Sequence, residues 1–146
     1  MHNNNIKIEI VKSADLGQLV ELYKDAGWWV EENDSQDPEF LNKIIQGSFC
    51  FVLATLDSKI IGMGRAISDG CSDAYIQDVA VHSSLRGQGI GQMIMDKIIS
   101  HLKEKKISWI GLISEPKAVS FYRRYGFSEM KDFVPFLLKE GQNEVR

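Results

Sequence analysis

The sequence predicts an α/β fold in which helices pack on a mixed β-sheet. Its 146 residues suffice for one domain, since a domain takes roughly 100–200 residues. Runs that alternate between apolar and polar residues, typical of strands, are interspersed with runs whose apolar residues recur at helical spacing. Together these runs predict the order β-α-α-β-β-β-α-β-α-β-β, with residues 1–146 as a single domain and an ordered core of about 6–140.

The first three elements are a strand and two helices. In residues 6–11, isoleucine occupies every second position, which predicts a strand. Ser13 can cap a helix that ends at Gly27. The apolar face of this helix consists of Leu16, Leu19, Val20 and Tyr23. A second helix is predicted between Asp37, which precedes a proline, and Gly47. Its apolar residues are Phe40, Leu41, Ile44 and Ile45.

Three strands follow, and the first two form a hairpin. Residues 49–56 and 59–67 are apolar runs joined by Asp57 and Ser58, and two such runs around a two-residue turn are typical of a β-hairpin. Residues 74–81 predict the third strand, because they are set off from the hairpin by an Asp-Gly turn.

The rest of the chain predicts two helices and three strands. A glycine-rich turn leads into a long helix whose apolar stripe consists of Ile90, Ile94, Ile98 and Leu102, reinforced by Met93 and Met95. Residues 108–113 predict a short buried strand. Glu115 begins the next helix, which Gly126 ends. Two last strands are predicted, one from Phe127 onward and one over Val134–Leu138.

Composition excludes several classes of function. The longest apolar run, residues 49–54, is far shorter than the roughly 18 residues of a membrane span, and residues 1–5 lack the features of a signal peptide. A net charge of −3 is not that of a nucleic-acid binder. Cys50 and Cys71 are too few for a zinc site or a disulfide framework. We therefore expect a cytoplasmic protein with free thiols and with no metal, membrane or nucleic-acid partner.

A glycine-rich turn is the first candidate for a binding site. It reads Arg86-Gly87-Gln88-Gly89-Ile90-Gly91 and stands between a strand and a helix. Glycines let a backbone approach a ligand closely, and the N–H groups of a helix N-terminus favour an anion, so phosphate binding is expected. A dinucleotide fingerprint is excluded because Gln92 stands where its third glycine belongs, and a P-loop because no lysine follows. A plain connecting turn is the alternative, and Arg86 weighs against it.

Two segments resemble the signatures of the GCN5-related N-acetyltransferases. The first is Asp78-Val79-Ala80-Val81 followed by the glycine turn, in which Arg86, Gly89 and Gly91 fill the motif Arg/Gln-x-x-Gly-x-Gly/Ala. The second is Ala118-Val119-Ser120-Phe121-Tyr122-Arg123-Arg124-Tyr125-Gly126-Phe127, similar to the signature Ala-x-x-Phe-Tyr-x-x-x-Gly-Phe. The resemblance covers nearly the whole chain and implies the fold of that family, a mostly antiparallel mixed sheet flanked by helices.

The resemblance implies acetyl-CoA as cosubstrate. Backbone groups of the strand would pair with the pantetheine arm, the glycine turn would hold the pyrophosphate, and Arg124 would meet the 3′-phosphate unless it is a solvated helix residue. The implied cofactor-binding residues are Val79, Ala80, Val81, Arg86, Gly87, Gln88, Gly89, Ile90, Gly91, Gln92, Phe121 and Arg124. Glu115 stands where the family often has an asparagine that holds pantetheine, so that contact is not carried over.

Two residues are candidates for catalysis. The family places a tyrosine at the position of Tyr122, and a phenol can protonate the departing thiolate because their pKa values, about 10 and 8.5, differ little. A core aromatic residue with a bonded hydroxyl is the alternative for Tyr122. Asp78 is the first candidate for a base, because some relatives have a carboxylate there. Its alternative is a capped or exposed strand acid.

The acceptor is expected to be a small-molecule amine. Trp28 and Trp29, followed by Glu31, Glu32, Asp34 and Asp37, combine aromatic and acidic groups that suit an ammonium ion, although a solvated acidic loop is the alternative. The sequence thus predicts an N-acetyltransferase domain that works by direct transfer in a ternary complex. A non-catalytic acyl-CoA-binding module is the rival interpretation. A homodimer is left open.

Overall fold

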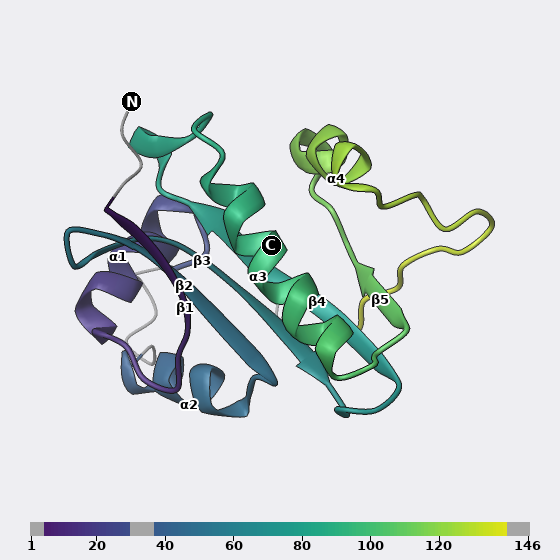
Figure 1. Ribbon diagram of the computed structural model, residues 1–146, viewed down its shortest axis with the longest axis horizontal. Helices are drawn as coiled ribbons and strands as arrows, with labels where there is room; N and C mark the ends of the chain where they lie inside the picture. The colour runs from purple at the N-terminus through teal and green to yellow at the C-terminus, as the bar shows by residue number, and fades with distance from the viewer. Residues whose placement is uncertain (1–4, 30–36, 140–146) are drawn as a thin grey trace.

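The computed structural model describes residues 5–29 and 37–139. Within them, five strands form one sheet in the order β1-β2-β3-β4-β5. The strands are β1 (Ile6–Ile10), β2 (Cys50–Leu56), β3 (Lys59–Ser68), β4 (Asp73–Val81) and β5 (Trp109–Leu112). Neighbouring strands run antiparallel except β4 and β5, which are parallel. The predicted mixed, mostly antiparallel sheet is therefore confirmed (Figure 1).

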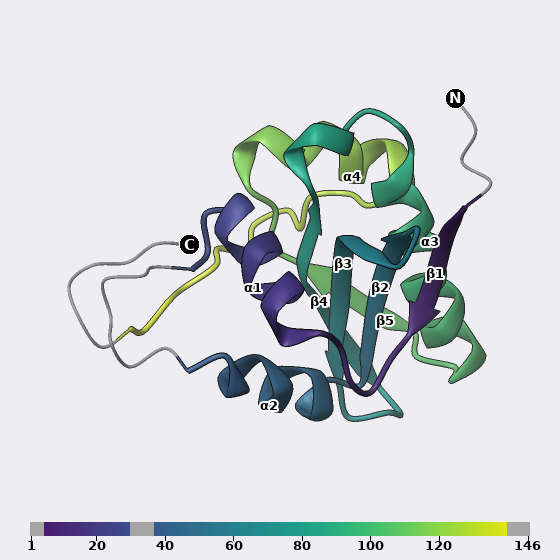
Figure 2. The same ribbon diagram turned by 90° about the vertical axis from the view of Figure 1, so that its left-hand side faces the viewer.

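Helices cover both faces of this sheet. The helices are α1 (Leu16–Asp25), α2 (Glu39–Gly47), α3 (Ile90–Glu104) and α4 (Val119–Tyr125), with short 3-10 turns at Ser83–Leu85 and Pro116–Ala118. Helices α1 and α2 pack on one face and α3 on the other (Figures 1 and 2). None of the helices in the described ranges has the length and apolar character needed to cross a bilayer.

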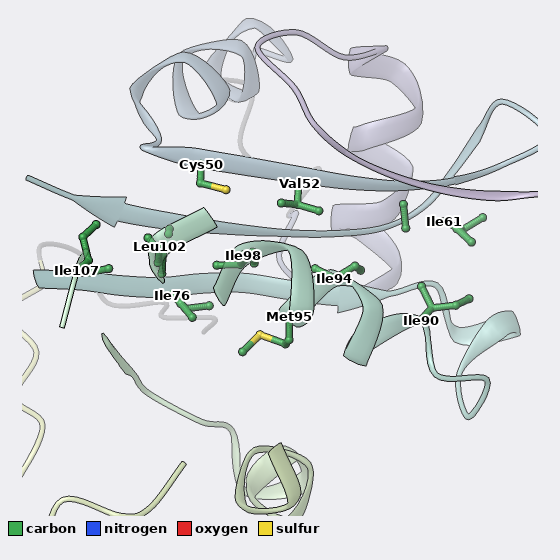
Figure 3. Close-up of a cluster of buried hydrophobic side chains, with 13 residues drawn as sticks. Cys50, Val52, Ile61, Ile76, Ile90, Ile94, Met95, Ile98, Leu102 and Ile107 are labelled. Carbon is green, nitrogen blue, oxygen red and sulfur yellow. The ribbon is translucent and has the colours of Figure 1, made fainter. Parts of the chain in front are cut away.

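Each face of the sheet has its own hydrophobic core. Under α3, the predicted stripe Ile90, Ile94, Ile98 and Leu102 is buried against the sheet, together with Met95 (Figure 3). Apolar residues of α1 and α2 bury Phe51, Leu53 and Met63 on the opposite face. Alternate side chains of a strand point to opposite faces, which is why the apolar runs of β2 and β3 can supply both cores.

The helix starts differ slightly from the prediction. The side chain of Asp15, not Ser13, caps α1 by accepting the N–H of Gln18 at 3.0 Å. Helix α2 begins at Glu39 with Pro38 as its N-cap, one residue later than the predicted Asp-Pro start, and Asp37 accepts the N–H of Glu39 at 2.9 Å. An aspartate two residues closer to α1 is an equally good cap, and the helical spacing alone does not distinguish the two positions.

The two strands predicted near the C-terminus do not form. Residues 126–139 contain neither helix nor strand, and the sheet in the described residues ends at β5. Alternation in this segment indicates a chain able to form a strand, but a strand exists only where a partner supplies the hydrogen-bond ladder. The prediction was therefore wrong on these two elements. Without a neighbouring strand, the segment keeps several apolar side chains exposed.

Strand β4 separates from β5 halfway along its length. The two strands pair only from Asp73 with Trp109 to Ile76 with Leu112, and β4 then continues alone on that side to Val81. At this point the pairing of β4 with β3 also shifts, and Asp78 has a φ of 55°. A left-handed residue and a register shift mark a β-bulge. The bulge therefore lies where β4 leaves β5.

Glycines in β3 allow α3 to pack close to the sheet. A methyl group at Gly64 would lie 2.8 Å from Cγ2 of Ile94 and 2.9 Å from Cδ1 of Ile98. We expect Gly64→Ala to lower the free energy of unfolding by about 1–3 kcal/mol, because the stiff branched side chains of α3 must shift. Gly47→Ala, at the end of α2 with open space around it, is the control and should be neutral or slightly stabilising. Urea unfolding measures both, and equal stabilities would contradict this packing argument.

Candidate active site

A cleft opens where β4 and β5 separate. It has a volume of about 690 Å³ and is walled by the end of β4, the glycine-rich turn, the start of α3 and the segment from Glu115 to Tyr125. Of the predicted cofactor-binding residues, all except Gln88 line this cleft, and so does Tyr122. The structure thus brings together two sequence motifs that are about thirty residues apart in the chain.

The glycine-rich turn presents backbone to the cleft. Gly87 and Gly89 have φ values of 79° and 81°, which side chains other than glycine rarely adopt. Gly89 caps α3 with no side chain of its own, so the first N–H groups of this helix stay open to a ligand. At Gly91, an added methyl would lie 3.5 Å from the ring of Phe121 on α4. These features suit a phosphate group held by backbone N–H groups.

Arg86 contacts two protein groups beside the cleft. Its Nε donates a hydrogen bond to the carbonyl oxygen of Val81 at 3.2 Å, and its guanidinium lies 3.8 Å from Oδ2 of Asp25. Asp25 also accepts hydrogen bonds from the backbone N–H and the hydroxyl of Ser83, at 2.8 and 2.6 Å. The end of α1 is therefore tied to the strand–turn junction beside the cleft.

The pKa of Asp25 reflects these contacts. Partial burial works against its ionisation, but the hydrogen bonds from Ser83 and the nearby His82 and Arg86 outweigh burial and lower the pKa. The carboxylate is therefore charged at neutral pH and keeps Arg86 oriented. Asp25 is not among the residues predicted from the sequence, because nothing in the pattern of α1 relates it to Ser83, which is 58 positions away.

Tyr122 faces the cleft from α4. Its ring lies 5.1 Å from that of Phe121 and 6.0 Å from that of Phe127, measured between centroids. Burial, with a smaller effect of Glu115, raises the pKa of its hydroxyl, so the phenol is protonated at neutral pH. Within residues 5–29 and 37–139 this hydroxyl has no protein hydrogen-bond partner, whereas Tyr125, also at the cleft, donates to Asp96 at 2.6 Å. The hydroxyl of Tyr122 can thus donate a hydrogen bond to a ligand in the cleft.

Asp78 does not line this cleft. Its Oδ2 accepts hydrogen bonds from Nε of Arg65 at 2.8 Å and from the hydroxyl of Tyr23 at 3.1 Å. Tyr23 belongs to the core under α1, so the carboxylate points to the face opposite α3, and its side chain is only 3% exposed. Arg65 also donates to Oε1 of Gln77 at 2.8 Å. The geometry thus favours the capped strand acid over the predicted base.

The predicted acceptor residues are only partly within the described chain. Trp28 lines the cleft, next to Ala26 at the end of α1, and its ring meets that of Tyr23 edge-on at 5.8 Å. Trp29 packs against the core under α1 and α2. The Asp37 carboxylate accepts a hydrogen bond from the N–H of Glu39 at the start of α2. Glu31, Glu32 and Asp34 lie outside the described residues. Trp28 is therefore the acceptor candidate that the structure brings to the cleft.

Some cleft residues were not predicted as part of the site. Glu115, Lys117 and Ala118 line it just before α4, and Glu115 lies 3.6 Å from the Lys117 ammonium. Ala118 is the first residue of the second family signature, so the sequence did contain a signal that this segment lines the cleft. Leu85 and Ala26 also line the cleft, but no chemical signal in the sequence marks these two apolar residues as cleft-lining.

Comparison with known proteins identifies the family. A family model described as an acetyltransferase (GNAT) domain matches residues 30–134. This range includes β4, the glycine turn and Tyr122, which wall the cleft. The cleft thus belongs to an acetyltransferase, and the chain is a member of the GCN5-related N-acetyltransferase family.

Individual relatives agree with this assignment. The chain is 40% identical over 128 residues to the uncharacterised N-acetyltransferase ycf52 of Pyropia yezoensis, covering 84% of this chain and 70% of the relative. It is 31% identical over 124 residues to serotonin N-acetyltransferase 2, chloroplastic, of Oryza sativa subsp. japonica, covering 82% and 60%. An aminoglycoside acetyltransferase from an uncultured soil metagenomic sample, solved with trehalose, matches with a TM-score of 0.76 at 26% identity, covering 95% and 99%.

The Asp78–Arg65 pair gives a prediction that separates a structural role from a catalytic one. Asp78→Asn keeps the shape and tolerates a positive φ, but it leaves the Arg65 charge buried without its counterion. We expect a loss of about 3 kcal/mol in the free energy of unfolding, as for other broken buried pairs. Asp78→Asn with Arg65→Gln removes both charges and should recover part of it. Unchanged stability with a large fall in kcat would instead mark Asp78 as the base.

Proposed function

We propose that this acetyltransferase takes acetyl-CoA and moves its acetyl group to a primary amine of a small molecule, by direct attack in a ternary complex. The observation that carries the proposal is the position of Tyr122, a neutral phenol in the same cleft as the glycine turn. A module that only bound acyl-CoA would not need a proton donor there. Release of CoA in the presence of a panel of amines tests this choice directly.

The cleft supports a defined arrangement of the cosubstrate. The pyrophosphate would lie on the N–H groups from Gly87 to Gly91, with Arg86 adding a positive charge. The pantetheine arm would run along the part of β4 that lacks β5 as a neighbour, pairing with backbone groups of Val79 and Val81 as an added strand. The thioester would then lie close to Tyr122, between β4 and α4.

The chemistry follows from this arrangement. The amine nitrogen attacks the thioester carbonyl, forming a C–N bond, and a main-chain N–H near Val79 stabilises the oxyanion. The C–S bond then breaks, and the hydroxyl of Tyr122 protonates the departing thiolate. Because Asp78 is paired with Arg65 on the other face, we assign removal of the ammonium proton to water rather than to that carboxylate.

The cysteines support direct attack rather than an acyl-enzyme. Neither of them lines the cleft. Burial raises the pKa of the Cys50 thiol to about 11, and the nearby Asp69 raises that of the exposed Cys71. Because the thiolate is the nucleophile, a raised pKa makes both thiols poor acyl carriers.

The acceptor is expected to be a cation. Trp28 offers an aromatic face at the cleft, and an ammonium ion on such a face gains about 0.5–2 kcal/mol. The names of two relatives specify acceptors that carry amines, serotonin and aminoglycosides, and support this class over acidic amino acids or sugar phosphates. A cytoplasmic location remains a prediction, since the name of the rice relative places that protein in the chloroplast.

Removal of the Tyr122 hydroxyl tests the general acid. Tyr122→Phe keeps the ring, so acetyl-CoA affinity should hardly change, while kcat should fall by ~10²–10⁴. Tyr125→Phe is the matched control, because that hydroxyl is bound to Asp96, and it should leave kcat within about twofold. Steady-state kinetics that show wild-type turnover in Tyr122→Phe would reduce Tyr122 to a packing residue.

The wild-type pH profile adds a second readout. The rate should rise from neutral pH toward ~9 as the acceptor ammonium loses its proton. The raised pKa of Tyr122 keeps the acid protonated through this range, so the rate should fall only above pH ~10. A descending limb near neutral pH would contradict a phenol as the acid.

Two neighbouring arginines test the position of the 3′-phosphate. Arg124 lines the cleft, whereas Arg123 forms an ion pair with Glu129 away from it. We expect Arg124→Ala to weaken binding of CoA by ~10-fold, as for loss of one charged phosphate contact, but to leave binding of dephospho-CoA unchanged. Arg123→Ala should change neither. Calorimetry that finds equal effects on both ligands, or none on CoA, would remove Arg124 from the site.

A further inference from the structure

Asp25 is the last residue of α1, where a negative charge does not help the helix. The carbonyl oxygens at a helix C-terminus carry partial negative charge, so a cation such as Lys24 is favoured there and a carboxylate is not. The Asp25 carboxylate is nevertheless ionised at neutral pH, because hydrogen bonds and nearby cations lower its pKa. Its side chain is only 18% exposed. What stabilises this charge must therefore come from outside α1.

Within the described chain, the partners of this carboxylate lie in residues 82–86, which lead from β4 into the glycine turn. Oδ2 accepts the N–H of Ser83 at 2.8 Å, and Oδ1 accepts the Ser83 hydroxyl at 2.6 Å. Nε2 of His82 lies 3.7 Å from Oδ1, and Nη2 of Arg86 lies 3.8 Å from Oδ2. Figure 2 shows the C-terminal end of α1 at the same end of the sheet as this segment. One side chain of α1 thus contacts both ends of the segment.

The Arg86 side chain contacts Val81 as well as Asp25. Its Nε donates to the carbonyl oxygen of Val81 at 3.2 Å. The side chain is still 53% exposed, so the guanidinium keeps N–H groups that a phosphate can reach. Asp25 does not line the cleft, although the next residue, Ala26, does. The carboxylate therefore lies behind the cleft wall, where it can act on a ligand through Arg86 without facing that ligand.

We propose that Asp25 is a positioning residue for the cosubstrate, which orients Arg86 toward the pyrophosphate that the N–H groups of the glycine turn also bind. This inference rests on the proposed use of acetyl-CoA. A side chain that is already oriented loses less conformational entropy when its ligand binds, so the ligand binds more tightly. The effect is large for arginine, because its long side chain has many rotamers to lose.

Positioning and simple charge repulsion predict opposite signs. A carboxylate near a phosphate site repels the phosphate, so neutralising Asp25 would strengthen binding if charge alone mattered. If Asp25 orients Arg86, neutralising it weakens binding. An amide has no charge to attract Arg86, and it has only one oxygen for the two donors of Ser83, which now bind different oxygens. The direction of the change in affinity therefore distinguishes the two effects.

The experiment measures the affinity of the full chain for CoA by calorimetry. Asp25→Asn keeps the shape of the side chain, and we expect it to weaken CoA binding by ~10-fold, as for the loss of one charge-assisted contact. Glu21→Gln is the matched control, because it removes the same charge from α1 one helical turn earlier, at a side chain that is 73% exposed. It should leave CoA affinity within about twofold. Urea unfolding of both variants checks that they are folded.

A double-mutant cycle separates positioning from a general structural role. If Asp25 acts through Arg86, then Asp25→Asn should change CoA affinity by less than about twofold when Arg86→Ala is already present. A structural role alone would give the same fold-change in both backgrounds.

Steady-state kinetics provide a second readout with two acetyl donors. Asp25→Asn should raise the KM for acetyl-CoA by ~10-fold and leave kcat within about twofold, because Tyr122 lies on a different wall of the cleft. Acetyl-pantetheine lacks the pyrophosphate, so its kcat/KM should be the same in the variant and the wild type.

Four outcomes would overturn the inference. Tighter CoA binding by Asp25→Asn would mean that Asp25 competes with the cosubstrate for Arg86. An equal effect with and without Arg86 would reduce Asp25 to a structural cap of the segment. Wild-type affinity in Asp25→Asn would remove Asp25 from cosubstrate binding and leave the proposed function intact. A wild-type protein that does not bind CoA would overturn the proposed function together with this inference.

Discussion

The separation of β4 from β5 is the constraint on which the rest of the molecule depends. Parallel strands normally stay paired along their whole length, because each unpaired N–H or C=O that is buried costs free energy. Here the pairing stops at Ile76, and the backbone of β4 beyond it faces the cleft. Those unpaired groups are what a pantetheine chain can use in the proposed complex.

Hydrogen bonds and ion pairs of two aspartates connect the region around this separation to helix α1. The Asp78 carboxylate accepts hydrogen bonds from Arg65 on β3 and Tyr23 on α1, so three elements meet at the bulge. Asp25, also on α1, binds Ser83 and lies beside Arg86 at the glycine turn. Helix α1 therefore contacts both ends of the exposed part of β4.

The sequence predicted what is encoded locally. The turn with Arg86 and the helix with Tyr122 are contiguous motifs, so their residues could be assigned without knowing the fold, and the apolar stripe of α3 follows from its period. The roles of Asp25 and Asp78 depend on partners in other elements, which a single sequence does not reveal. The strands that alternation predicted after Gly126 do not form, because alternation does not show whether a neighbouring strand supplies the hydrogen-bond ladder, and in the described residues this segment pairs with none.

The same bulge decides how protons can move in the proposed reaction. Amide formation needs one proton delivered to sulfur and one removed from nitrogen. The left-handed conformation at Asp78 turns its carboxylate to the side of Arg65 and Tyr23, while α4 brings Tyr122 to the cleft with a pKa raised by burial. Burial that disfavours the phenolate also makes Tyr122 unsuitable as a base. In the proposed reaction the acid would therefore come from a side chain and the base from water.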